Sequence, residues 1–207
     1  MMQISAPIQT ELILIGGGHA NIQVLKSFAM RPVAGLRVSM ISDVINAPYS
    51  GMLPGYVAGE YSYDEMHINL VRLANFANAR FIKSNITSID TINRKIHCEG
   101  RPEISYDLIS VNTGITPDFG DIKGAREHCI AVKPISQFLR HLRKLDASVI
   151  SLNDTIAIIG SGAAGIELAF AFRARFNKKN IKPKIVLIGS AERFFPTLPK
   201  KCHQTIY

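Results

Sequence analysis

The chain has 207 residues, 47% of them hydrophobic and 19% charged, which fits a globular protein of one or two domains and excludes disordered and fibrous classes. Its net charge of +8 comes from 24 Lys and Arg against 16 Asp and Glu, but no aromatic residues interleave with the basic ones, so we expect a solvated face and no nucleic-acid partner. Cys98, Cys129 and Cys202 are scattered without a CxxC pair, so we expect a reducing cytoplasm, and neither a disulfide framework nor a metal site.

The first predicted unit opens with an apolar strand, Glu11–Ile15, that runs directly into three glycines. A helical pattern follows the glycines. A strand, a glycine-rich turn and a helix are typical of a dinucleotide-binding βαβ unit. In that unit Gly16 would permit the tight turn and Gly18 would let a pyrophosphate approach the backbone at the helix N-terminus. Asn21 replaces the third glycine of the usual pattern, so a turn that binds nothing remains the alternative.

The second strand is expected at 36–41. An acidic residue at this strand end commonly accepts hydrogen bonds from ribose hydroxyls. Ser42 stands at the end and Asp43 follows it, so both are candidates.

The stretch 46–55 contains two prolines and two glycines, which predicts a fixed backbone; a plain surface turn is the alternative. Beyond it, Ser62 and Glu65 have the spacing of a capping box, and Asn69 is placed to cap a helix at 70–77.

From Arg80 the hydrophobic period changes to two, which predicts strands at 81–89, 95–98 and 104–111. The last strand leads into Asn112-Thr113-Gly114, where a hydroxyl and a flexible backbone stand at a strand end. The irregular stretch that follows is expected to separate two domains.

A second unit repeats the first: a strand begins at Thr155, and Gly160, Gly162 and Gly165 complete the glycine pattern before a helix. Two such units predict two bound dinucleotides, or one unit that has lost its ligand. The apolar run from Thr155 contains Glu167 and three glycines, so it is not expected to span a membrane.

The ordered set of motifs resembles the two-dinucleotide-binding-domain flavoproteins of the pyridine nucleotide-disulfide oxidoreductase superfamily. The Gly-Gly-Gly-His-Ala run, with the loop Pro48–Gly55, is most similar to a branch related to type II NADH dehydrogenases and often associated with selenophosphate synthetase. The resemblance implies an α/β fold. A Rossmann-like FAD-binding domain with a β-meander, 1–117, would be followed by the start of a second Rossmann-like, NAD(P)-binding domain, 118–207.

The same resemblance implies two sets of cofactor contacts. For FAD, the implied residues are Gly16, Gly18, His19, Ala20, Ser42 or Asp43, Tyr49, Ser50, Gly51, Met52, Leu53, Pro54, Ile86, Thr113 and Gly114. For NADH or NADPH, they are Gly160, Gly162, Ala164, Gly165 and Glu167, with Glu167 near the nicotinamide and Lys133 near the flavin edge. Glu167 and Lys133 are the only candidates for a catalytic role.

Two departures from the family narrow the chemistry. Ser50 stands where sulfur-reducing relatives carry a cysteine, so sulfur redox through this loop is not expected. Gly189-Ser190 replaces an acidic residue typical of NADH specificity and Arg193 is nearby, so NADH and NADPH both stay open. The chain also ends after only two strands of the second unit, so a truncated protein is expected.

The expected function is an FAD-dependent NAD(P)H oxidoreductase that passes hydride to the flavin and electrons on to a quinone or another small acceptor. The alternative is a truncated, non-catalytic dinucleotide-binding module that acts with a partner such as selenophosphate synthetase. The expected location is the cytoplasm, with peripheral contact at the inner face of the membrane as an alternative.

Overall fold

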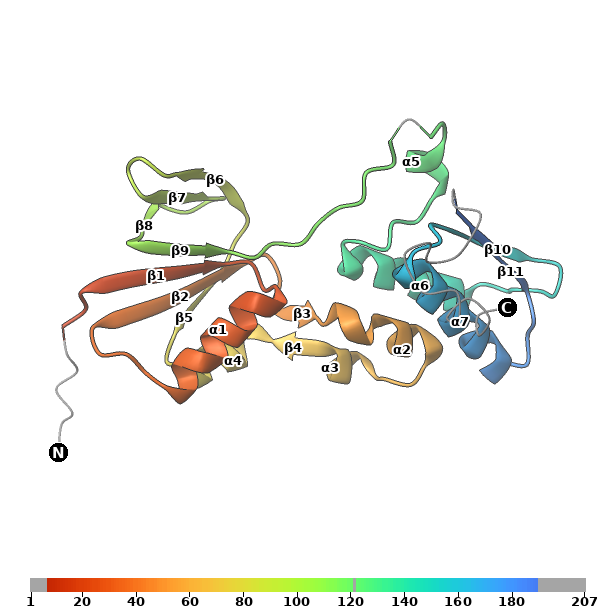
Figure 1. Cartoon of the computed structure of the whole chain (residues 1–207), viewed down its shortest axis with the longest axis horizontal. Helices are drawn as coiled ribbons and strands as arrows, with labels where there is room; N and C mark the ends of the chain where they lie inside the picture. Colours follow the sequence, from red (N-terminus) through yellow and green to blue (C-terminus); the bar gives the residue numbers. More distant parts are fainter. Residues whose placement is uncertain (1–6, 121, 190–207) are drawn as a thin grey trace, which may run out of the picture. The chain divides into compact units, whose positions relative to one another are not determined.

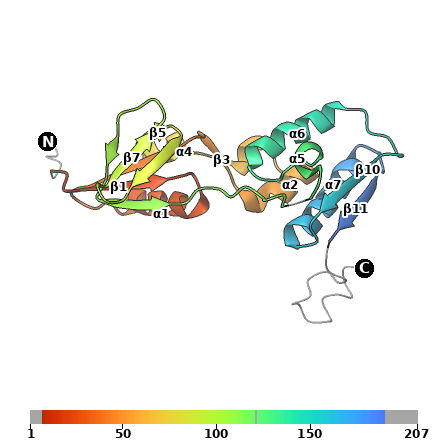
Figure 2. The same cartoon turned by 90° about the horizontal axis from the view of Figure 1, so that it is seen from above.

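The computed structural model describes residues 7–120 and 122–189 and shows a mixed α/β chain (Figures 1 and 2). Its contacts divide it into two compact units. One contains the chain up to Tyr49 together with His67–Pro134, and the other contains Ser50–Met66 and the chain from Ile135 onward. The expected domains, 1–117 for FAD and 118–207 for NAD(P)H, are defined by the cofactors that they would bind, so this division stays a prediction. Ser190, Arg193 and Cys202 lie outside the described residues.

A four-stranded parallel sheet forms the first unit, in the order β5 (Arg80–Lys83), β2 (Leu36–Ser42), β1 (Thr10–Ile15) and β9 (Leu108–Val111). Alternate residues of β1 face opposite sides, so each side has its own core. The helices α1 (His19–Met30) and α4 (Leu70–Phe76) cover one side. That core contains Leu14, Ile22, Leu25, Val38, Met40, Ala47, Leu70 and Ala74.

An antiparallel meander covers the other side of the sheet, with strands β6 (Ile86–Asp90), β7 (Lys95–Cys98) and β8 (Ile104–Ser105). The core on this side contains Ile13, Ile15, Ile41, Ile96, Cys98 and Tyr106. These two layers confirm the predicted nucleotide-binding fold with a meander.

Two predicted strands are each divided in the structure. The predicted strand 81–89 is β5, in the parallel sheet, followed by β6, in the meander. The predicted strand 104–111 is β8 followed by β9, with Tyr106 and Asp107 between them. At this second break the Glu11 N–H donates to the Asp107 carboxylate, 2.7 Å, which places the chain on the parallel sheet. A period of two identifies a strand but not the sheet to which the strand belongs, so the sequence pattern merged β5 with β6 and β8 with β9.

The predicted turn chemistry between β2 and α4 is confirmed. A short antiparallel pair, β3 (Asn46–Pro48) and β4 (His67–Asn69), encloses a 3-10 turn η1 (Ser50–Met52) and the helices α2 (Leu53–Ala58) and α3 (Tyr63–Met66). The Ser62 N–H donates to Glu65, 2.7 Å, while the Glu65 N–H donates back to the Ser62 hydroxyl, 3.3 Å. The Asn69 amide oxygen accepts the Arg72 N–H at 2.9 Å and so caps α4.

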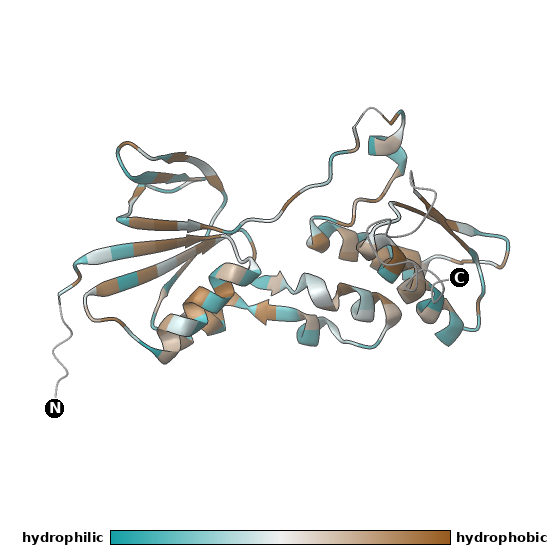
Figure 3. Ribbon diagram, in the orientation of Figure 1, coloured by the Kyte–Doolittle hydropathy of each residue, from teal (hydrophilic) through white to brown (hydrophobic). Residues whose placement is uncertain are grey.

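In the first unit the short helix α5 (Ala125–His128) follows β9. The second unit has the parallel pair β10 (Thr155–Ile159) and β11 (Lys184–Ile188), both strongly apolar, with α6 (Ile135–Ala147) and α7 (Ala163–Lys178) (Figure 3). Within this unit α2 packs against α7. Arg175 donates to the Val57 carbonyl, 2.7 Å, and Lys178 to the Gly59 carbonyl, 3.0 Å, so both satisfy carbonyls at the C-terminus of α2. Among the described residues, no helix combines the length and the apolar character that crossing a membrane requires.

Candidate functional site

The glycine-rich turn lies at the carboxyl end of β1 and enters α1. Gly16 has a φ of +87°, a left-handed conformation that favours glycine, whereas Gly18 is extended with a φ of −69°. A Cβ at Gly16 would lie 2.4 Å from the Asn112 carbonyl oxygen, and a Cβ at Gly18 would lie 2.2 Å from the Asn112 side-chain oxygen. Both glycines are therefore required by the close approach of Asn112, whatever ligand the turn holds.

Asn112 is a site residue that sequence reasoning missed. It follows β9, and its side-chain oxygen accepts hydrogen bonds from the N–H groups of Ala20, 3.0 Å, and Asn21, 3.4 Å. Its carbonyl oxygen accepts the Gly18 N–H at 3.2 Å. The available signal was that a polar side chain stands directly before Thr113-Gly114, at the end of a strand next to β1.

Asn21 explains why the first glycine pattern is incomplete. Its side chain is fully buried and donates to the carbonyls of Ile15, 2.8 Å, and Gly16, 3.0 Å, while its oxygen accepts the Ser110 hydroxyl, 2.7 Å. In the second unit the equivalent position is Gly165, where a Cβ would lie only 1.8 Å from the Gly160 carbonyl oxygen. In the first unit the side-chain amide of Asn21 thus holds the helix to the turn, whereas in the second unit the backbone of Gly165 lies directly against that of Gly160.

His19 and Tyr49 lie together at the same turn. Their rings stack with centroids 4.8 Å apart and planes inclined by 20°, and both side chains are exposed. Among the other implied flavin-loop residues, Ser50, Gly51, Met52, Leu53 and Pro54 belong to the second compact unit. Tyr49 is thus the residue of this set that lies in the first unit, against His19 of the first glycine-rich turn, and the flavin contacts of the others stay predictions.

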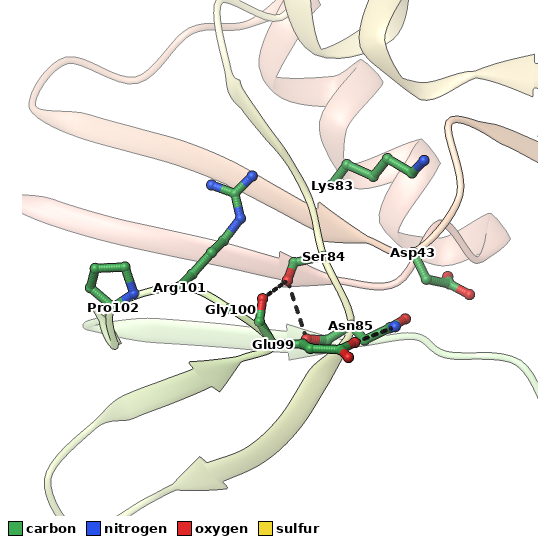
Figure 4. A pocket seen from close by; sticks show the side chains of 8 residues that line it. All are labelled: Asp43, Lys83, Ser84, Asn85, Glu99, Gly100, Arg101 and Pro102. Carbon is green, nitrogen blue, oxygen red and sulfur yellow. Dashed lines mark hydrogen bonds between the residues drawn. The ribbon is translucent and has the colours of Figure 1, made fainter.

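A cavity of about 640 Å³ lies at the carboxyl ends of β2 and β5 (Figure 4). Asp43 lines it, whereas the Ser42 side chain is buried and its hydroxyl accepts the Val44 N–H, 3.3 Å. Of the two candidates at this strand end, Asp43 is thus the one that faces open space. The full lining consists of Asp43, Lys83, Ser84, Asn85, Glu99, Gly100, Arg101 and Pro102.

Hydrogen bonds between the link from β5 to β6 and the turn after β7 hold this cavity's shape. The Asn85 amide donates to the Glu99 carboxylate, 2.8 Å, and the Glu99 N–H donates to the Asn85 carbonyl, 2.9 Å. The Ser84 hydroxyl lies 3.3 Å from the carbonyls of both residues (Figure 4). Ile86, implied for the adenine, is not in the lining, but it directly follows Ser84 and Asn85.

The second glycine-rich turn is more open than the first. Gly160 has a φ of +111°, and Gly162 is the N-terminal cap residue of α7, with no side-chain cap from the described residues. A Cβ at Gly162 would have no described atom within 4 Å. The backbone N–H groups of this helix start are accessible to an anion.

The remaining candidates are divided between the two units. Ala164 and Glu167 are exposed on α7, and Thr113 and Gly114 are exposed after β9. Lys133 is half-buried before Pro134. Nothing in these positions assigns a catalytic role to Glu167 or Lys133, and both stay predictions.

Two strand–turn–helix units, the first backed by an antiparallel meander, define a protein with two dinucleotide-binding folds of the Rossmann type. The chain belongs to the pyridine nucleotide-disulphide oxidoreductase family, whose sequence profile matches residues 10–206.

Its relatives include NADH dehydrogenases. It is 28% identical over 172 residues to the NADH dehydrogenase-like protein YutJ of Bacillus subtilis, covering 83% of this chain and 47% of that protein. It is 22% identical over 203 residues to the type II NADH:quinone oxidoreductase of Staphylococcus saprophyticus, covering 90% of this chain and 50% of that protein. The chain therefore spans about half the length of these relatives.

Solved structures share the fold. The chain is similar to NDH2 from Plasmodium falciparum in complex with NADH, with a TM-score of 0.77 and 19% identity over 94% of this chain and 44% of that one. It is also similar to a water-forming NADH oxidase from Lactobacillus brevis bound to NADH, with a TM-score of 0.74 and 18% identity over 96% of this chain and 44% of that one.

Proposed function

We propose that this chain forms the cofactor-binding part of an FAD-dependent NAD(P)H oxidoreductase that delivers electrons to a quinone or another small acceptor. The observation that carries the proposal is the presence of two glycine-rich strand–turn–helix units within one chain of this family. Bound FAD would supply a hydride acceptor for the reduced nicotinamide and a two-electron donor for the final acceptor, which would take up protons as it is reduced.

The first unit fits the adenosine end of FAD. Asp43 offers carboxylate oxygens at the carboxyl end of β2, where ribose hydroxyls can donate to them. The cavity of about 640 Å³ beside it has room for an adenosine. The α1 N-terminus would hold the pyrophosphate, because the partial positive charge of a helix N-terminus favours an anion. The exposed rings of His19 and Tyr49 lie at the same turn.

The second unit fits a reduced pyridine nucleotide. α7 is 16 residues long, and at its N-terminal cap residue, Gly162, open space and the absence of a described side-chain cap leave room for a pyrophosphate. NADH and NADPH are both substrates in this proposal. Electron delivery to a quinone is favoured here by the names of two relatives, a type II NADH:quinone oxidoreductase and a plant mitochondrial NAD(P)H-ubiquinone oxidoreductase.

The described cysteines support an electron path without sulfur chemistry. Cys98 and Cys129 form no disulfide, and burial raises the pKa of the Cys98 thiol, which disfavours the reactive thiolate. Ser50 supplies only a hydroxyl in the predicted flavin loop. Cytoplasmic location, contact with the inner face of a membrane, and association with selenophosphate synthetase stay predictions.

Flavin content and anaerobic reduction test the proposal. The purified chain is incubated with excess FAD, freed of unbound flavin, and titrated with NADH or NADPH while the flavin absorbance is followed. We expect a yellow protein that either nucleotide bleaches. A folded protein that stays colourless would refute the proposal, and a yellow protein that neither nucleotide reduces would favour a non-catalytic binding module.

The choice of variant matters in this test. A Gly18→Val substitution would not separate loss of ligand from loss of fold, because Asn112 already fills the space beside Gly18. Gly162→Val is the better probe of the second site, since a Cβ at this position would have no described atom within 4 Å.

A further inference from the structure

The cap on α1 is supplied by a residue from a different strand. The first N–H groups of a helix have no partner within the helix and carry partial positive charge. At α1, the Asn112 side-chain oxygen accepts two of them, from Ala20 at 3.0 Å and Asn21 at 3.4 Å. Asn and Asp are about equally good at this kind of capping. Capping strength alone therefore does not explain why the residue is an amide.

The close fit around Asn112 makes it part of the glycine-rich turn. A Cβ at Gly16 or at Gly18 would overlap Asn112 atoms, at 2.4 and 2.2 Å respectively. The Gly18 N–H also donates to the Asn112 carbonyl, 3.2 Å. Any shift of Asn112 thus shifts the turn itself. By contrast, α7 has no side-chain cap from the described residues.

We propose that Asn112 is a positioning residue for the pyrophosphate of FAD, acting as a neutral cap that holds the Gly16–Ala20 turn in place. A carboxylate at this position would make the same hydrogen bonds but add a negative charge at the helix end that receives the phosphates. The amide fixes the turn and leaves the positive helix end to the anion. This inference rests on the proposed function, and it identifies a residue through which this chain controls FAD affinity.

Asn112→Asp separates a structural role from a positioning role, because the two roles predict opposite changes. We expect the unfolding midpoint without FAD to stay at or above that of the wild type, since an acidic side chain near a helix N-terminus is stabilising. We expect the Kd for FAD to rise at least tenfold at low salt. That difference should shrink as salt is added, because salt screens charge–charge repulsion. Flavin fluorescence titration and thermal unfolding measure the two quantities.

Asn69→Asp is the matched control. Asn69 caps α4 through the Arg72 N–H at 2.9 Å, so the substitution repeats the same chemistry at a second helix start, whose next residue, Leu70, packs beside Gly17. We expect its Kd for FAD to rise less than that of Asn112→Asp, because Asn69 accepts no N–H of the glycine-rich turn or of α1. Direct titration with NADPH provides a second control, because Asn112→Asp should leave binding at α7 unchanged.

The outcomes distinguish this inference from the proposed function. A folded wild-type chain that binds no FAD would refute the proposed function itself. If the wild type binds FAD and a folded Asn112→Asp variant binds it equally well, the positioning role is wrong. If that variant does not fold, Asn112→Ala decides: weaker FAD binding supports the role, and unchanged or tighter binding overturns it.

Discussion

Restoring the usual third glycine of the first unit should damage this protein. The substitution Asn21→Gly completes the glycine pattern, but it removes a fully buried amide that hydrogen-bonds to Ile15, Gly16 and Ser110. Each such bond contributes about 1 kcal/mol net to the free energy of unfolding, so about 3 kcal/mol is at stake. Asn21→Ala recovers roughly 0.5 kcal/mol through the better helix propensity of alanine, whereas glycine is about 1 kcal/mol worse than alanine.

We therefore expect losses of about 2.5 kcal/mol for Asn21→Ala and about 3.5 kcal/mol for Asn21→Gly, against a typical total of about 5–15 kcal/mol. Urea unfolding followed by circular dichroism measures both. The double variant Asn21→Ala/Ser110→Ala should lose less than the sum of its single variants, because the two side chains share one bond. If Asn21→Gly is as stable as the wild type, the buried amide does not support the turn and this reasoning is wrong.

Three further predictions concern the second unit and the cysteines. Gly162→Val should keep the unfolding midpoint within a few degrees of the wild type but weaken NAD(P)H binding at least tenfold, about 1.4 kcal/mol. Gly165→Ala should instead lower the unfolding midpoint, because its Cβ meets the Gly160 carbonyl oxygen. Equal nucleotide affinity in a folded Gly162→Val variant would contradict the second site. Replacing all three cysteines by serine should leave NAD(P)H-to-acceptor activity within about threefold, and a loss above about tenfold, some 1.4 kcal/mol in the barrier, in a folded variant would restore a role for sulfur. Burial alone would raise the pKa of Asp146, but hydrogen bonds and charges from Arg175 and Lys179 hold this pKa below its ordinary value. The stability that Asp146 contributes is therefore present above the ordinary aspartate pKa and is lost as the pH falls through the lowered pKa. Acid unfolding of Asp146→Asn should show a smaller loss of stability over that pH window, and an unchanged acid profile would argue against the ion pairs.

Local patterns predicted those elements that local chemistry determines. The glycine turns, the capping box at Ser62 and the cap at Asn69 were all predictable, because spacing along the chain decides each of them. The strand β7 was also located with its observed bounds.

The remaining features depend on contacts between distant parts of the chain. The break between β5 and β6 reflects a change of sheet, which a period of two does not reveal. The role of Asn112 depends on β9 pairing with β1, 91 to 92 residues away from the helix start that it caps. The choice between Asp43 and Ser42 depended on the directions of two neighbouring side chains, since Asp43 lines the cavity and Ser42 is buried.

The attachment of α2 to α7 has a consequence for the order in which the protein is made. The hydrogen bonds from Arg175 to Val57 and from Lys178 to Gly59 join residues 118 and 119 positions apart. At about 5–20 residues per second, a ribosome needs roughly 6–24 s to synthesise the intervening chain. Throughout that interval α2 has no α7 to pack against. The packing of α2 within its unit is therefore completed only late in synthesis, after α7 has been made.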